Sequence, residues 1–163
     1  MLNTKIILKI IGSLLFIESG LMLACMLVGV IYKDDDMLAF LFSMIITMFS
    51  GLMMRYFGRN ASNTLGRRDA YMVVTLTWVL FSLFGTLPFM ISGYVNSFTD
   101  AYFEMMSGFT TTGATVVDNV EALPHGLLFW RSLSQWIGGL GIVFFTIALL
   151  PSLVGGSVKV FAA

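Results

Sequence analysis

The stretch Ser-Gly-Phe-Thr-Thr-Thr-Gly-Ala-Thr, residues 107–115, decides the fold of this chain. Its first three residues end an apolar segment, residues 98–109. As a helix this segment would be about 18 Å long and so too short to cross a bilayer. On either side lie apolar segments, residues 71–92 and 127–154, that are long enough to do so. Backbone that continues at membrane depth beyond a short helix cannot face lipid, because each unpaired amide there costs several kcal/mol. The order therefore predicts a re-entrant segment that faces protein or a water-filled cavity.

The residues around the turn indicate what its backbone faces. Thr99 or Asp100 can cap the short helix, and Asp100 also suits the positive end of the helix dipole. The negative end of that helix then points at residues 110–114, where Gly113 permits backbone conformations that other residues avoid. A half-helix, a turn and a returning span form the arrangement in which backbone carbonyls replace the water shell of a cation. The threonine run alone leaves a polar loop at the outer surface as an alternative, and the flanking segments favour the pore loop.

The composition is that of an integral membrane protein. Of the 163 residues, 58% are hydrophobic and 11% are charged, against roughly 25% charged residues in soluble domains. Four apolar stretches supply the roughly 20 residues that cover the hydrocarbon core. They are residues 6–31, 37–56, 71–92 and 127–154.

Pro88 is expected to kink or end the third of these spans.

The predicted fold is an all-α membrane protein with three parts. Residues 1–56 form an N-terminal hairpin of two transmembrane helices, and residues 57–70 form a basic linker. Residues 71–163 form one channel-like helix–pore loop–helix unit.

Charged residues are sorted along the chain. Basic residues precede the first span, fill the linker and follow the fourth span: Lys5, Lys9, Arg55, Arg59, Arg67, Arg68 and Lys159. The positive-inside rule therefore places the linker and both ends of this multi-pass chain in the cytoplasm. The acidic run Asp34–Asp36 then lies outside, where it either concentrates cations at an outer vestibule or is a set of solvated loop charges.

The fourth span opens with Trp-Arg-Ser-Leu-Ser-Gln-Trp-Ile-Gly-Gly-Leu-Gly, residues 130–141. Its glycines are Gly138, Gly139 and Gly141. They remove side chains from one stretch, so that another backbone can approach closely or the helix can bend. Arg131 and Gln135 are four residues apart and share a helix face. Arg131 either snorkels to the membrane interface or lies near the mouth of a pore.

These two motifs, residues 107–115 and residues 130–141, closely resemble the membrane subunit of Trk-type bacterial potassium uptake systems, in the Trk/Ktr/HKT superfamily. The two helices before the pore unit are a feature of the Trk branch, and the resemblance covers essentially the whole chain. It implies a potassium-channel-like fold in the bacterial inner membrane, with four helix–pore–helix repeats around one ion path. This chain would supply the first repeat.

The resemblance also assigns roles to residues of the turn. It implies that one strand of the selectivity filter is formed by Thr110, Thr111, Thr112, Gly113 and Ala114. Thr111 and Thr112 are expected to coordinate potassium directly. Gly113 occupies the filter-glycine position, which in this superfamily goes with potassium selectivity, whereas serine there in the first repeat is associated with sodium transport.

The same resemblance implies partners. Family members are several hundred residues long, so the first expected partner is the rest of the same polypeptide, with three further repeats; assembly of four copies is the alternative. A homodimer and a cytosolic nucleotide-binding regulatory subunit are expected as well, in addition to the lipid bilayer. Potassium is the transported ion, and neither an organic cofactor nor a nucleic-acid partner is expected.

Residues that could carry other chemistry are few. The sequence holds one cysteine and one histidine, Cys25 and His125, and it predicts neither a transition-metal site nor an enzyme. Glu18, inside the first span, is either an ion-coupled carboxylate or a buried group that is protonated or hydrogen-bonded. Glu104 is expected to anchor the short helix to its neighbours rather than to touch ions. The alternative function is a non-transporting membrane scaffold, whose Gly-rich fourth span packs against a partner helix.

Overall fold

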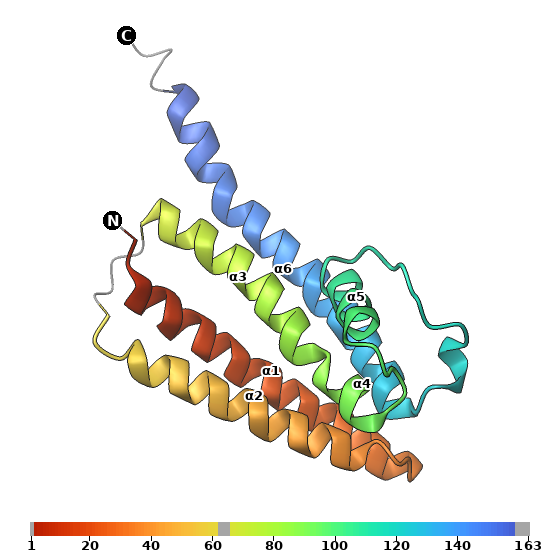
Figure 1. Cartoon of the computed structure of the whole chain (residues 1–163). Helices are drawn as coiled ribbons and strands as arrows, with labels where there is room; N and C mark the ends of the chain where they lie inside the picture. Colours follow the sequence, from red (N-terminus) through yellow and green to blue (C-terminus); the bar gives the residue numbers. More distant parts are fainter. Residues whose placement is uncertain (1, 62–65, 159–163) are drawn as a thin grey trace.

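The computed structural model describes residues 2–61 and 66–158, and these residues form helices and connecting segments without a strand. The helices are α1 (Thr4–Tyr32), α2 (Met37–Phe57), α3 (Arg67–Gly85), α4 (Leu87–Ser92), α5 (Phe98–Phe109), the 3-10 helix η1 (Val120–Ala122) and α6 (His125–Val158). The four long helices pack together as a bundle, and the short α5 lies beside α4 at one end of it (Figure 1). The predicted all-α fold is therefore confirmed.

Apolar helices of membrane-spanning length account for most of the bundle. Within the described residues, three segments are long and apolar enough to cross a membrane: Thr4–Tyr32, Met37–Phe57 and Arg68–Ser92, which joins α3 and α4. α6 is a helix of 34 residues, and its role as the fourth span stays a prediction from its sequence. Large apolar side chains such as Ile17 and Phe49 are 57% and 66% exposed, as expected of helix faces that contact lipid.

The hairpin of α1 and α2 closes through small residues. A left-handed residue, Lys33 (φ 60°), ends α1, and its N–H donates to the carbonyls of Gly29 and Val30. Where the helices cross, a Cβ built on Gly12 would lie 2.5 Å from the carbonyl oxygen of Gly51. The two backbones therefore approach as closely as glycine allows, and the short connection makes the helices antiparallel neighbours.

The start and the end of α3 have local causes. α3 stops before Pro88, which sits in the first turn of α4 and has no N–H to continue the helix, so the predicted interruption is confirmed. α3 begins at Arg67, inside the predicted linker, because the carboxylate of Asp69 caps the preceding turn. That carboxylate accepts the N–H of Gly66 at 3.2 Å and the N–H of Asn3 at 2.9 Å.

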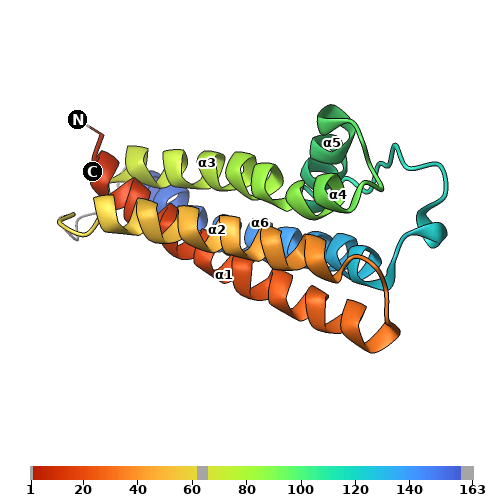
Figure 2. The same ribbon diagram turned by 60° about the horizontal axis from the view of Figure 1, so that its bottom comes forward.

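The two ends of the bundle carry different segments. The start of α1, the end of α2, the start of α3 and the end of α6 lie at one end (Figure 2). Gly58, directly after α2, packs there against the backbone of Lys5 and Lys9. The loop between α1 and α2, α5 and the segment after α5 lie at the opposite end (Figures 1 and 2). The cytoplasmic assignment of the basic end stays a prediction.

Candidate functional site: a turn held between α5 and α6

α5 begins at an earlier cap than Thr99 or Asp100, the two predicted ones. The N-cap is Ser97, which is extended (φ −91°, ψ 125°), and its hydroxyl accepts the N–H of Asp100 at 3.4 Å. Phe98 and Thr99 are already helical, so Ser97 is the last non-helical residue with a short polar side chain. Asp100 lies in the first turn, where its charge suits the positive end of the helix dipole.

The threonine run ends α5. The backbone N–H groups of Thr110, Thr111 and Thr112 donate to carbonyls in the last turn of the helix, each at 2.9 Å. This is the Schellman pattern, whose left-handed position is usually glycine. Here the left-handed residue is Thr111 (φ 57°), a β-branched residue for which this conformation costs on the order of 1–3 kcal/mol. Backbone strain is therefore stored in the turn itself.

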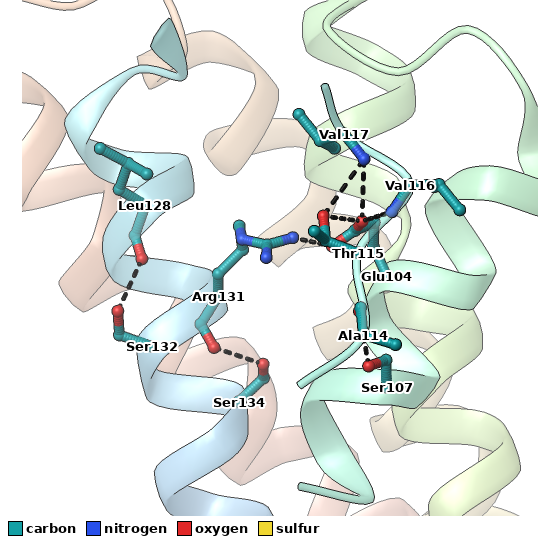
Figure 3. A network of polar contacts seen from close by, with 10 residues as sticks. All are labelled: Glu104, Ser107, Ala114, Thr115, Val116, Val117, Leu128, Arg131, Ser132 and Ser134. Atoms are coloured by element: carbon teal, nitrogen blue, oxygen red, sulfur yellow. Dashed lines mark hydrogen bonds and ion pairs between the residues drawn. The ribbon is translucent and has the colours of Figure 1, made fainter. Parts of the chain in front are cut away.

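Beyond the turn, an extended segment, residues 114–117, runs back along α5 (Figure 3). We call this segment the returning strand, although it pairs in no β-sheet among the described residues. Gly113 (φ 75°) reverses the direction, and a Cβ added there would meet no atom within 4 Å, so the requirement for glycine is conformational. The hydroxyl of Ser107 on α5 donates to the carbonyl of Ala114 at 2.7 Å. Within the described residues, the carbonyls of Thr111, Thr112 and Gly113 accept no hydrogen bond.

Glu104, one turn before Ser107 on α5, holds the rest of the returning strand (Figure 3). Its Oε1 accepts the N–H of Val116 at 2.6 Å, the N–H of Val117 at 3.3 Å and the hydroxyl of Thr115. Its other oxygen, Oε2, forms an ion pair with Arg131 of α6. The two side chains are only 1% and 15% exposed, so this is a buried pair. The prediction that Glu104 anchors α5 to its neighbours is confirmed.

The three glycines of α6 have different surroundings. A Cβ on Gly138 would lie 2.7 Å from the carbonyl carbon of Phe109, so α6 presses directly on the backbone at the end of α5. A Cβ on Gly141 would lie 2.6 Å from the ring of Trp78 on α3. A Cβ on Gly139 would have its nearest neighbour at 3.9 Å, an ordinary contact. Gly138 and Gly141 therefore pack inside this chain, which removes them from a surface that a partner helix could use.

The structure brings most of the predicted site residues together. Residues 110–114 form one turn, with Gly138 behind its start and Arg131 behind the strand that follows it. Gln135 shares the helix but is exposed, and Gly141 lies further along α6 against α3. Arg131 points into the protein to meet Glu104 rather than out to the interface.

Two side chains at the site make structural hydrogen bonds that were not predicted from the sequence. Ser107 fixes the start of the returning strand, and Trp130 is fully buried, with its indole N–H donating to the Gly85 carbonyl at 3.1 Å. That bond joins α6 to the end of α3, next to the break that Pro88 imposes. No residue pattern near Trp130 indicated this partner, because the Gly85 carbonyl is brought to α6 only by the packing of the helices.

The acidic run in the loop between α1 and α2 contacts the start of α6. Asp34 Oδ2 accepts the backbone N–H of His125 at 2.7 Å and lies 3.0 Å from its ring Nδ1, while Asp36 Oδ2 accepts the N–H of Leu127 at 3.0 Å. The ring of His125 also stacks on Tyr32, with 4.0 Å between centroids. Burial raises the pKa of Asp36, and the Leu127 N–H partly offsets this. Two of the three acids are thus caps of a helix.

Two other groups singled out from the sequence lie inside α1. Cys25 is buried, in keeping with a small apolar role. Glu18 is fully buried as well, and neither of its carboxyl oxygens has a hydrogen-bond partner among the described residues.

A bundle of apolar helices in which a half-length helix, a turn and a returning strand lie between two long helices is the potassium-channel-like unit of an integral membrane protein. This chain belongs to the TrkH family of cation transport proteins, whose family pattern matches residues 37–162.

Individual relatives agree with this assignment. The chain is 40% identical over 157 residues to the Trk system potassium uptake protein TrkH of Halomonas elongata, covering 95% of this chain and 33% of the relative. It is 36% identical over 163 residues to the protein of the same name from Escherichia coli K12, covering 99% of this chain and 34% of the relative. The crystal structure of the potassium transporter TrkH from Vibrio parahaemolyticus is similar, with a TM-score of 0.84 and 38% identity, over 90% of this chain and 32% of that chain. The chain thus spans about a third of the length of the relatives it matches.

Proposed function

We propose that this chain supplies one strand of a potassium-selective filter and works in the uptake of potassium across the membrane. The observation that carries the proposal is the turn at Thr110–Ala114. It follows a half-length helix, is fixed to that helix by hydrogen bonds, and leaves the carbonyls of Thr111, Thr112 and Gly113 exposed without hydrogen-bond partners among the described residues. Such carbonyls are the groups that replace the hydration shell of a potassium ion.

In this proposal the members of the turn have separate roles. Thr111 and Thr112 offer carbonyls to the ion, and Gly113 permits the left-handed bend between them and the returning strand. Thr110 caps α5, and Ala114 anchors the strand because its carbonyl is engaged by Ser107. One strand cannot surround an ion, so the exposed turn needs oxygens from elsewhere.

The proposed source of those oxygens is the rest of a longer polypeptide, in which this chain is the first of four repeats. The names of its relatives support potassium as the transported ion. The full proposal includes a homodimer in the bacterial inner membrane, with the basic end of the bundle in the cytoplasm. A cytosolic nucleotide-binding subunit is the proposed regulator.

The test is the substitution Gly113→Ser in the full-length protein. Serine in the left-handed conformation strains the turn, so we expect the preference for potassium over sodium to fall. The measurement is uptake of rubidium, as a potassium analogue, with and without competing sodium, in cells that lack other potassium uptake. Growth at low potassium gives a second readout.

Gly93→Ser is a matched control. Gly93 ends α4 with φ 77°, and a Cβ there would also meet nothing within 4 Å, so the conformational cost is the same. It lies outside the turn and should leave the cation preference unchanged. A Gly113→Ser protein that keeps the potassium preference of the wild type would show that this turn is not the filter.

A further inference from the structure

We propose that Glu104 is the positioning residue of the strand that follows the turn, and that Arg131 keeps Glu104 in place. Through this pair, the carbonyls of Thr115 and Val116 face the ion path in addition to those of the turn. The inference rests on the proposed function and adds to it the residues that set the geometry of the outer half of the strand.

The geometry of the peptide groups carries the argument. A trans peptide is planar, and its N–H and C=O point in opposite directions. The N–H of Val116 points at Glu104 Oε1, on the α5 side of the strand, and the N–H of Val117 is shared between Glu104 Oε1 at 3.3 Å and the Thr115 hydroxyl oxygen at 3.1 Å, which itself contacts Glu104. The carbonyls of the same two peptide groups, those of Thr115 and Val116, therefore point away from α5. Thr115 and Val116 are both exposed residues, in agreement with an open side of the strand opposite α5.

The carbonyl of the preceding residue, Ala114, has the opposite orientation. The carbonyl of Ala114 points toward α5, because it accepts the hydroxyl of Ser107 at 2.7 Å. Ser107 and Glu104 are three residues apart on one helix and lie on the same face of α5. The strand is thus held to α5 at two points, at Ala114 by Ser107 and at residues 115–117 by Glu104. Glu104 therefore determines which carbonyls face away from α5 at the second point.

Electrostatics explain why an ion pair is used here. A carboxylate accepts several hydrogen bonds at one oxygen, and such charge-assisted bonds are stronger than neutral ones. A carboxylate this deeply buried needs a compensating charge, and the guanidinium of Arg131 supplies it from α6. Arg131 also ties the strand to α6, so the filter strand is held between the two helices of the pore unit (Figure 3).

The experiment compares Glu104→Gln, Arg131→Gln and the double variant in the full-length protein. Each single change leaves one buried charge without its partner, and the double variant restores charge balance with neutral hydrogen-bonding groups. We expect each single variant to lower the potassium-over-sodium preference of rubidium uptake at least fivefold. The double variant should regain part of that loss, because the two changes are coupled. The second readout is the rise in the unfolding temperature of purified protein when potassium replaces sodium, which should shrink in each single variant.

Ser132→Ala is the matched control, because Ser132 neighbours Arg131 and its hydroxyl donates to the Leu128 carbonyl of its own helix at 3.0 Å. It should keep the wild-type preference. Singly substituted proteins that fold and keep the preference would overturn the inference. If the single variants do not reach the membrane, the double variant decides: reduced selectivity supports the role, and wild-type selectivity overturns it. Absence of any potassium preference in the wild type and in Ser132→Ala would instead refute the proposed function.

Discussion

Replacing Gly138 with alanine tests whether the contact between α6 and α5 sets the position of the turn at residues 110–114. A Cβ there would lie 2.7 Å from the carbonyl carbon of Phe109 and 3.1 Å from its Cα. Ordinary contacts begin at 3.4 Å, so the end of α5 has to move by about 0.7 Å or more, directly before Thr110. Over-packing of this kind costs about 1–3 kcal/mol, while the better helix propensity of alanine returns about 1 kcal/mol. We expect a net loss of up to about 2 kcal/mol of stability.

The neighbouring glycine provides the comparison. Gly139→Ala gains the same helix propensity, and its Cβ would meet nothing closer than 3.9 Å, so it should stabilise the protein by up to about 1 kcal/mol. The assay is thermal unfolding of both full-length variants in one detergent, with rubidium uptake measured in parallel. Gly138→Ala should unfold at a lower temperature and show a weaker potassium preference. Equal stability of the two variants would mean that α5 yields without cost, and the reasoning from the close contact would be refuted.

Two further predictions concern the turn and the loop between α1 and α2. Thr111→Gly should hold or raise stability in thermal unfolding, because it relieves a left-handed β-branched residue, whereas Thr112→Gly should lower it by roughly 0.5–1 kcal/mol. Burial raises the pKa of Asp36 above its ordinary 3.8, so the folded state favours the protonated acid. Its contribution to stability is complete below pH 3.8 and is lost as the pH rises through the raised pKa. Asp36→Asn keeps an acceptor for the Leu127 N–H and should remove that part of the pH dependence, whereas exposed Asp35→Asn should not.

Features that depend on neighbours in the sequence were predictable. The lengths of apolar segments gave the long helices, Pro88 gave the break after α3, and the short segment at residues 98–109 matches α5 residue for residue. The helix lengths follow from the rise per residue, and the break after α3 follows from the missing N–H of proline. Both effects act between residues that lie within one or two helical turns of each other. The cap of α5 was missed by two residues because Ser97, Thr99 and Asp100 are all good caps, and only the backbone conformation selects one.

Features that depend on how helices cross were not predictable. The position of Arg131 on α6 indicates which residues share its face, but its acid is on α5 and meets it only after the two helices pack. The same holds for the glycines. Gly138 and Gly139 are indistinguishable in sequence, yet one meets the backbone of Phe109 and the other has free space. A helix rotation of about 100° per residue separates the two environments.

The acidic loop shows how such a long-range contact changes the meaning of a charge. α6 begins directly after Pro124, so no side chain of its own N-cap can accept the first N–H groups of the helix. Asp34 and Asp36 accept those of His125 and Leu127 from a position 91 residues earlier in the chain. The carboxylate of Asp34 also suits the positive end of the α6 dipole. The hairpin, predicted as a separate unit, is therefore fastened to the pore unit at the start of α6. Of the acidic run, Asp35 is the exposed member, so the loop presents less free negative charge to solvent than the sequence implies.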